Sequence, residues 1–91
     1  MKVTHSAKFG RIIKKLHSQE KTALDKAIKR ICDDPQIGRA KKGDLAGLYT
    51  YKFKVKDQEW ILAYLMVSDF EIRLVLLGPH ENYYRVLKRL L

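Results

Sequence analysis

Eight consecutive apolar residues, from Trp60 to Val67, constrain the fold of this chain more than any other feature of its sequence. The run is far shorter than the roughly 20 apolar residues that a membrane-spanning helix needs. It is instead typical of a central strand that is covered on both faces. We therefore predict a sheet with this strand at its centre, and no membrane-spanning segment.

Two further strands flank the central one along the chain. Residues 49–56 alternate between apolar and polar side chains, which is the period of a strand with one buried and one wet face. Short turns at residues 57–58 and 68–69 separate the central strand from its neighbours, and residues 71–77 form the third strand. We expect an antiparallel meander. The side chains on the wet face of the first strand are those of Lys52, Lys54 and Lys56.

Two amphipathic helices precede the meander. Within residues 6–16, and again in the following segment, apolar side chains recur at the i, i+3, i+4 and i+7 positions of a helix stripe. Ser6 and Ser18 are the expected N-caps. The second helix is expected to end before Pro35, because proline disfavours a helical conformation in the residue that precedes it. The short connection predicts an antiparallel helical hairpin, which needs another layer to cover its apolar stripe.

The remaining segments complete an α+β domain. Residues 2–5 are long enough only for a short strand, residues 35–47 form a loop with three glycines, and residues 80–91 have the spacing of a short C-terminal helix. The expected order is βααβββα, an antiparallel sheet with the N-terminal helical hairpin packed on one face. A chain of 91 residues fits a single domain, residues 1–91.

The charge of the chain is strongly basic and unevenly distributed. Nineteen Lys and Arg residues against ten Asp and Glu residues give a net charge of +9, and residues 1–32 hold nine of the basic side chains but only two acidic ones. Such an excess is consistent with binding a polyanion such as nucleic acid, an acidic membrane face or an acidic protein. A solvated basic face that keeps a small protein in solution would give the same composition.

The sequence predicts no disulfide, metal site, cofactor or secretory signal. Cys32 is the one cysteine, which excludes an internal disulfide framework and suits a reducing cytoplasm. The three histidines show no close spacing with one another or with that cysteine, so a metal site is not expected. The N-terminal segment lacks the apolar core of a signal peptide.

The wet face of the first meander strand is the candidate binding surface. Its three lysines leave the sheet about 6–7 Å apart, so their row attracts an anion that spans it. The loop upstream adds Arg39, Lys41 and Lys42, and His80 follows the third strand, which runs the same way as the first. The alternatives are a solubilising lysine row or protection of a sheet edge, with His80 as a strand-end residue.

These residue types suit the cleavage of a phosphodiester bond without a metal. In RNA, the attacking 2′-OH needs a proton acceptor and the leaving 5′-oxygen needs a proton donor. Cations can stabilise the negative charge that develops on the phosphorus centre between them. Histidine can take either proton role near neutral pH, and Tyr83 and Tyr84 lie close to His80 in the sequence.

The segment Tyr51-Lys52-Phe53-Lys54-Val55, the apolar strand that ends near Tyr64, and the segment Gly78-Pro79-His80-Glu81-Asn82-Tyr83-Tyr84-Arg85 together resemble the RelE/ParE superfamily of bacterial toxins. Length, basic charge and the order of elements match over nearly the whole chain. Members are the toxin halves of type II toxin–antitoxin pairs. RelE-like members enter the ribosomal A site and cut messenger RNA, whereas ParE-like members inhibit DNA gyrase and cut nothing.

The resemblance implies a role for individual residues. Lys52 and Lys54 match two family lysines that bind phosphate and assist proton transfer, and His80 matches a position that is basic or histidine. Tyr84 best matches the C-terminal tyrosine that stacks on a base or assists the attacking hydroxyl. RelE has an arginine where this chain has Ile61, and Arg73 is the candidate substitute. The residues that we expect to contact RNA are Lys56, Arg39, Lys41, Lys42, Arg73, Tyr83 and Arg85.

The leading hypothesis is a cytoplasmic, metal-independent endoribonuclease that cuts messenger RNA on the ribosome. The alternatives are a ParE-like, non-enzymatic inhibitor of DNA gyrase and a degenerate toxin that only binds its antitoxin. The implied partner is an acidic antitoxin segment that folds on contact, and no membrane partner is expected. That segment could lie across the hairpin helices, add a strand to a sheet edge or displace the C-terminal helix. We also expect ribosomal RNA or the antitoxin to contact basic residues of the first helix, namely Lys8, Arg11, Lys14 or Lys15.

Overall fold

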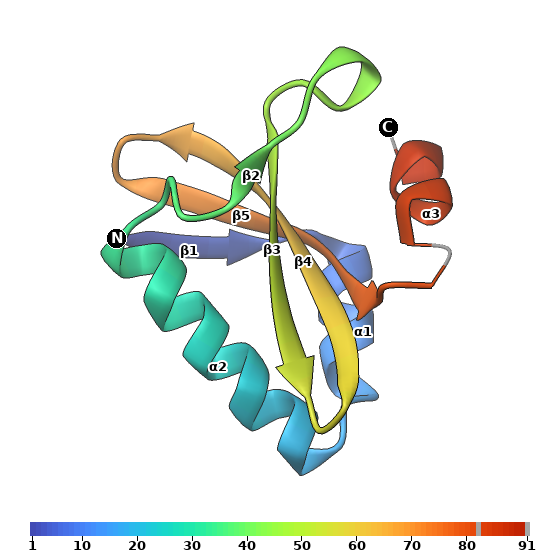
Figure 1. The fold of residues 1–91 in the computed structure, drawn as a ribbon. Coiled ribbons are helices and arrows are strands. Elements are labelled where there is room, and N and C mark those ends of the chain that lie inside the picture. Colours follow the sequence, from blue (N-terminus) through green and yellow to red (C-terminus); the bar gives the residue numbers. More distant parts are fainter. Residues whose placement is uncertain (82, 91) are drawn as a thin grey trace.

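The computed structural model describes residues 1–81 and 83–90, in which a five-stranded sheet carries helices on both faces (Figure 1). The strand order across the sheet is β1-β5-β4-β3-β2. The strands are β1 (Lys2–His5), β2 (Arg39–Ala40), β3 (Leu48–Val55), β4 (Gln58–Ser68) and β5 (Glu71–Pro79). The α-helices are α1 (Ala7–Lys14), α2 (Ser18–Asp33) and α3 (Tyr83–Leu90), and η1 (Gly43–Leu45) is a 3₁₀ turn. The predicted α+β architecture is confirmed.

The predicted meander of β3, β4 and β5 is antiparallel throughout. Two strands extend it. β1 pairs in parallel with β5, an arrangement that the expected antiparallel sheet did not include, and β2 pairs with Tyr49 and Thr50 of β3. The strand β2 and the turn η1 both lie in the segment that was expected to be an irregular loop. The C-terminal helix begins at Tyr83 rather than at His80, and the expected continuation to Leu91 lies outside the described residues.

The turn between β3 and β4 lies one residue earlier than expected, at Lys56 and Asp57. A two-residue hairpin turn favours positive φ values, and Lys56 has a φ of 56°. Lys56 therefore belongs to the turn and not to β3. The predicted row of three lysines on one face is wrong at this position, and it contains only Lys52 and Lys54.

Capping at the helical hairpin follows one prediction and departs from the other. The Ser6 hydroxyl accepts a hydrogen bond from the Phe9 N–H at 3.1 Å, so Ser6 is the N-cap of α1 as predicted. The N-cap of α2 is His17 rather than Ser18, because the Glu20 carboxylate accepts a hydrogen bond from the His17 N–H at 2.9 Å. The helix ends at Asp33, just before Pro35 as predicted.

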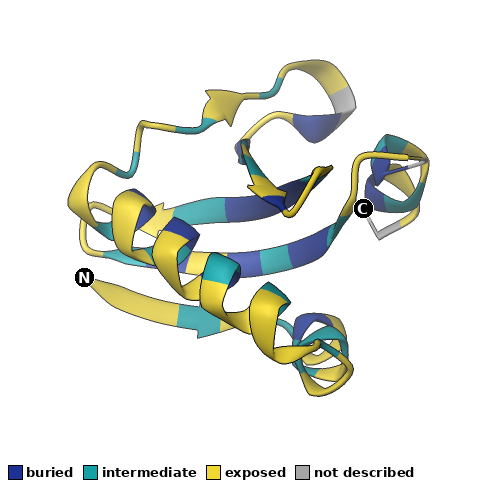
Figure 2. Cartoon of the chain, turned by 60° about the horizontal axis from the view of Figure 1, so that its bottom comes forward, coloured by how far each residue is buried: buried dark blue, intermediate teal, exposed yellow. Residues whose placement is uncertain are grey.

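The sheet is buried on both faces, which explains why β4 is apolar at every central position (Figure 2). The larger core lies between the sheet and the α1–α2 hairpin. Its most deeply buried members are Phe9, Ile31, Leu62, Tyr64 and Ile72. A smaller core lies on the opposite face, beneath α3 and η1. Its members are Leu45, Leu48, Ile61, Ala63, Leu76, Tyr83 and Leu87.

α3 packs against β5, and the Lys52 and Lys54 side chains of β3 are exposed. None of the helices in residues 1–81 and 83–90 has both the length and the apolar composition that crossing a membrane requires.

Candidate functional site

Polar side chains from β2 and β3 gather on the α3 face of the sheet. Lys52 is the cross-strand partner of Ile61, which lies in the core beneath α3. Thr50, two residues earlier, shares the face of Lys52, and Arg39 of β2 is the partner of Thr50. The pleat of the sheet thus places two cations and a hydroxyl group side by side. Lys54 lies on the same face, one alternation further along β3.

A cavity of about 270 Å³ lies where β2 begins beside β3. Its lining residues are Ile37, Arg39, Lys41, Thr50, Tyr51, Lys52 and Tyr84. Three of them are cations and three carry hydroxyl groups, the donors that bind a phosphate group. Sequence reasoning missed Ile37, Thr50 and Tyr51 as site residues. The alternation that places Thr50 two residues before Lys52 could have identified Thr50.

The buried side chain of Tyr64 fixes the segment that leads into the cavity. Its hydroxyl donates a hydrogen bond to the Pro35 carbonyl at 2.7 Å and accepts one from the Gly38 N–H at 3.1 Å. Burial raises the pKa of this phenol above its ordinary value, so it stays neutral and can make both bonds. These two hydrogen bonds hold residues 35–38 in place, and Arg39, the first residue of β2, follows directly. No local sequence signal could have identified this contact, which joins residues 26 positions apart.

Tyr84 borders the same cavity from α3. The Lys41 ammonium donates a hydrogen bond to the Tyr84 hydroxyl at 3.2 Å and lies 4.7 Å from the centroid of its ring. Burial alone would raise the pKa of the Tyr84 phenol. The hydrogen bond from Lys41, the nearby hydroxyl of Thr50 and the charges of Lys41 and Lys52 outweigh burial and lower that pKa below its ordinary value of 10.0. The surroundings of this hydroxyl thus make the phenol more acidic than an ordinary tyrosine.

His80 reaches the same place from the end of β5. Its backbone N–H donates a hydrogen bond to the Glu59 carbonyl at 3.0 Å, and Glu59 is the cross-strand partner of Lys54. The imidazole centroid lies 6.4 Å from that of Tyr84, with the rings nearly perpendicular. His80 does satisfy the backbone at the strand end, as the alternative interpretation holds, and its exposed side chain also lies beside Tyr84.

Tyr83 does not belong to this site. Its side chain is only 3% exposed, and its hydroxyl donates a hydrogen bond to the Leu76 carbonyl at 2.9 Å. The interpretation of Tyr83 as an RNA contact is therefore wrong, because its ring fills the core beneath α3. Of the two adjacent tyrosines, packing leaves Tyr84 facing the cavity.

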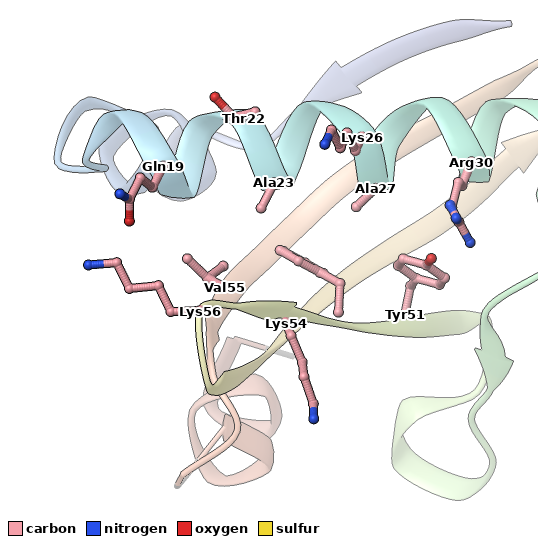
Figure 3. A pocket seen from close by; sticks show the side chains of 11 residues that line it. Gln19, Thr22, Ala23, Lys26, Ala27, Arg30, Tyr51, Lys54, Val55 and Lys56 are labelled. Carbon is pink, nitrogen blue, oxygen red and sulfur yellow. The ribbon is translucent and has the colours of Figure 1, made fainter.

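Two further expected RNA contacts lie elsewhere. Arg73 lies on the α3 face with Lys52 and Lys54, but it pairs with Leu65 rather than with a residue near Lys52. Its Nε donates to the Thr4 hydroxyl at 3.5 Å. It lies at the other end of the sheet, so it does not substitute for an arginine at Ile61. The side chains of Lys54 and Lys56 point away from each other (Figure 3), and Lys56 extends toward α2.

Ile61 itself is fully buried in the core beneath α3. Lys42 and Arg85 are exposed, do not line the cavity, and stay predictions as RNA contacts. In the described part of the chain, His, Cys, Asp and Glu side chains form no group of three that could hold a metal ion.

A second cavity, of about 500 Å³, lies between α2 and β3 on the hairpin side of the sheet (Figure 3). We call it the α2–β3 groove. Apolar side chains that line it include Ala23, Ala27 and Val55, and cations that line it include Lys26, Arg30 and Lys56. β2 pairs only with the start of β3, so residues 51–55 form a sheet edge beside this groove.

Comparison with known proteins gives a consistent result. A family model described as the ParE-like toxin of type II bacterial toxin-antitoxin systems matches residues 3–88. No curated protein matches the chain. The chain is similar to the crystal structure of the isolated E. coli RelE toxin, with a TM-score of 0.68 and 20% identity over 99% of this chain and 98% of that chain.

It is also similar to a mutant of E. coli RelE in complex with a peptide of the antitoxin RelBc. The TM-score is 0.70, with 19% identity over 99% of this chain and 97% of that chain. At such identities the likeness establishes the fold.

Proposed function

This chain belongs to the family of ParE-like toxins of type II bacterial toxin–antitoxin systems, and we propose that it acts as an endonuclease on messenger RNA bound to the ribosome. The observation that carries this proposal is the convergence of His80, Tyr84 and Lys52 beside a cationic cavity. An inhibitor that acts only by binding would not require an imidazole and a phenol of altered acidity at one place.

The residues in the cavity and beside it suit the cleavage of RNA by its own 2′-OH. Arg39 and Lys52 bind the scissile phosphate and stabilise the charge that develops on it. His80 and Tyr84 supply the proton donor and acceptor that the two RNA oxygens need. Lys54, further along the same face, binds the adjoining phosphate of an extended strand.

A translation reaction in vitro with purified protein tests the proposal. Ribosome-bound message should be cut by the wild type and not detectably by His80→Ala or Lys52→Ala. Lys56→Ala is the matched control: it removes the same charge from the neighbouring turn, on the other side of the sheet, and should cut normally. An intact message in the presence of correctly folded wild-type protein would falsify the enzymatic proposal.

The second candidate function is inhibition of DNA gyrase, which the ParE-like description of the matching family favours. In that case the basic surface and α3 would contact the target, and His80 would be dispensable. A supercoiling assay separates the candidates, because inhibition of gyrase without RNA cleavage supports the second one. If both assays are negative and expression of the protein leaves cell growth normal, the chain is a degenerate toxin that only binds its antitoxin.

The α2–β3 groove is suited to the antitoxin. Its apolar floor and cationic rim match an acidic segment with apolar side chains, and the edge of β3 can accept an added strand. Of the three expected antitoxin positions, the groove supports the hairpin helices and the sheet edge. A small acidic protein encoded beside this one is the natural candidate for binding experiments.

A further inference from the structure

Lys41 joins the loop after β2 to the C-terminal helix. Its backbone N–H donates a hydrogen bond to the Leu48 carbonyl at 2.9 Å, which holds it at the start of β3. Its side chain is half-buried, whereas lysine side chains are usually exposed. The ammonium group contacts both the hydroxyl and the ring of Tyr84. Because both its backbone and its ammonium group are held, Lys41 is better suited to orient Tyr84 than to bind RNA directly.

We propose that Lys41 is a positioning residue, which holds and activates Tyr84 as the group that takes the proton from the attacking 2′-OH of the RNA. This inference rests on the proposed endonuclease function. It goes beyond it by assigning the two proton transfers, which the convergence of His80 and Tyr84 leaves open.

The charges around Tyr84 support this assignment. The Lys41 ammonium donates a hydrogen bond to its hydroxyl, and the charge of Lys52 acts on it from β3. Arg39 and the neutral, hydroxyl-bearing Thr50 line the same cavity. His80 lies beside the ring, and the neutral phenol of Tyr83 lies 5.7 Å away between centroids on the same helix. Glu59 lies further off, between Lys54 and His80 in the sheet. Cations favour the phenolate, and the lowered pKa of Tyr84 agrees with their arrangement.

The two proton transfers then follow. Tyr84 as phenolate takes the 2′-OH proton while the 2′-oxygen forms its bond to phosphorus. The bond from phosphorus to the 5′-oxygen breaks, and protonated His80 gives its proton to that oxygen. The products are a 2′,3′-cyclic phosphate and a 5′-hydroxyl end. Afterwards Tyr84 releases a proton to solvent and His80 takes one up, so both groups return to their starting forms.

The first measurement follows the ionisation of Tyr84 without RNA. The absorbance of phenolate is titrated in the wild type and in Tyr84→Phe, and the difference isolates Tyr84 from the other four tyrosines. The same pair is compared in the Lys41→Met background. The pH midpoint of Tyr84 ionisation should move to a higher value when Lys41 is replaced by Met. It should stay near the wild-type value in Lys41→Arg. An unchanged midpoint in a folded Lys41→Met protein overturns the inference, whatever the activity.

The second measurement is the pH dependence of single-turnover cleavage. Tyr84→Phe should cut at least about a hundred times more slowly, the usual scale for loss of a general base. Lys41→Met should lose about tenfold at neutral pH and regain activity as the pH rises, because more phenolate then forms. A loss that is equal at every pH would indicate a purely structural role and overturn the inference. Intact message with the wild type would instead refute the endonuclease function, a result that the titration keeps distinguishable.

Discussion

The hydroxyl of Tyr64, in the middle of the sheet, accepts a hydrogen bond from the backbone N–H of Gly38, at the entrance to β2. A Cβ atom on Gly38 would lie 2.5 Å from the Tyr64 hydroxyl and 3.0 Å from the Thr50 carbonyl oxygen. The close approach therefore requires a glycine. It couples the larger core, to which Tyr64 belongs, to the cavity on the opposite face, because Arg39 follows Gly38 directly.

Gly38→Ala should destabilise the protein by about 1–3 kcal/mol, the usual cost of an added methyl group in a close-packed site. Unfolding in urea measures the change. Gly78→Ala is the control, since its Cβ would meet only the Tyr83 ring at an ordinary 3.7 Å. The cost should shrink in a Tyr64→Phe background, where the hydroxyl is gone. Costs that are equal in both backgrounds would contradict the role of the Tyr64 contact.

Tyr83 should make the protein less stable at alkaline pH. Burial raises the pKa of its phenol, and the nearby Tyr84 adds to the rise. In the unfolded chain this phenol ionises near its ordinary value of about 10. Above that pH the folded state holds a proton that the unfolded state has lost. The contribution of Tyr83 to the free energy of unfolding is thus complete below about pH 10 and falls as the pH rises further.

Tyr83→Phe separates the contribution of the Tyr83 hydrogen bond from the effect of its ionisation. It loses the hydrogen bond to Leu76 and should be about 1 kcal/mol less stable at neutral pH. Above pH 10 its stability should fall less steeply than that of the wild type. Urea unfolding at a series of pH values checks this, and identical slopes for the two proteins would show that Tyr83 ionises normally in the fold.

The basic stripe of α1 should bind RNA phosphates. Lys8, Arg11 and Lys15 line a pocket of about 240 Å³ together with Ile12. Reversing two charges, as in Lys8→Glu with Arg11→Glu, should weaken ribosome binding and flatten its dependence on salt, because fewer counterions are released. The control is Lys21→Glu with Lys29→Glu, the same change of charge on exposed positions of α2. Equal weakening by both pairs would indicate only an effect of net charge.

The rim of the α2–β3 groove should recognise the antitoxin. Lys26→Glu with Arg30→Glu places acidic groups beside an acidic partner, so affinity should fall at least tenfold while RNA cleavage stays near that of the wild type. Binding is measured by calorimetry with the cognate antitoxin. The same control pair on α2, at positions 21 and 29, should bind normally. Unaltered affinity of the groove variant would place the antitoxin elsewhere.

Local patterns in the sequence predicted the elements well. The alternation in β3, the apolar run of β4 and the helical spacing before Pro35 each appear in the structure within a few residues. Ser6 was identified as a cap because its hydroxyl acts on the helix that immediately follows it. Alternation also placed Lys52 and Lys54 on one face. These features depend on backbone geometry over a few residues, so the sequence determines them by itself.

The composition of the site depended on contacts between distant residues. The turn after β3 begins one residue earlier than expected, so Lys56 lies in the turn and not in the row of lysines. Strand pairing places Arg73 at the far end of the sheet. Tyr83 and Tyr84 are neighbours in the chain, yet the packing of α3 buries one and turns the other toward Lys41. Side-chain identity alone carries no such information. Only the pairing of strands and the docking of a helix decide which of many basic and aromatic groups meet, because those contacts join residues tens of positions apart.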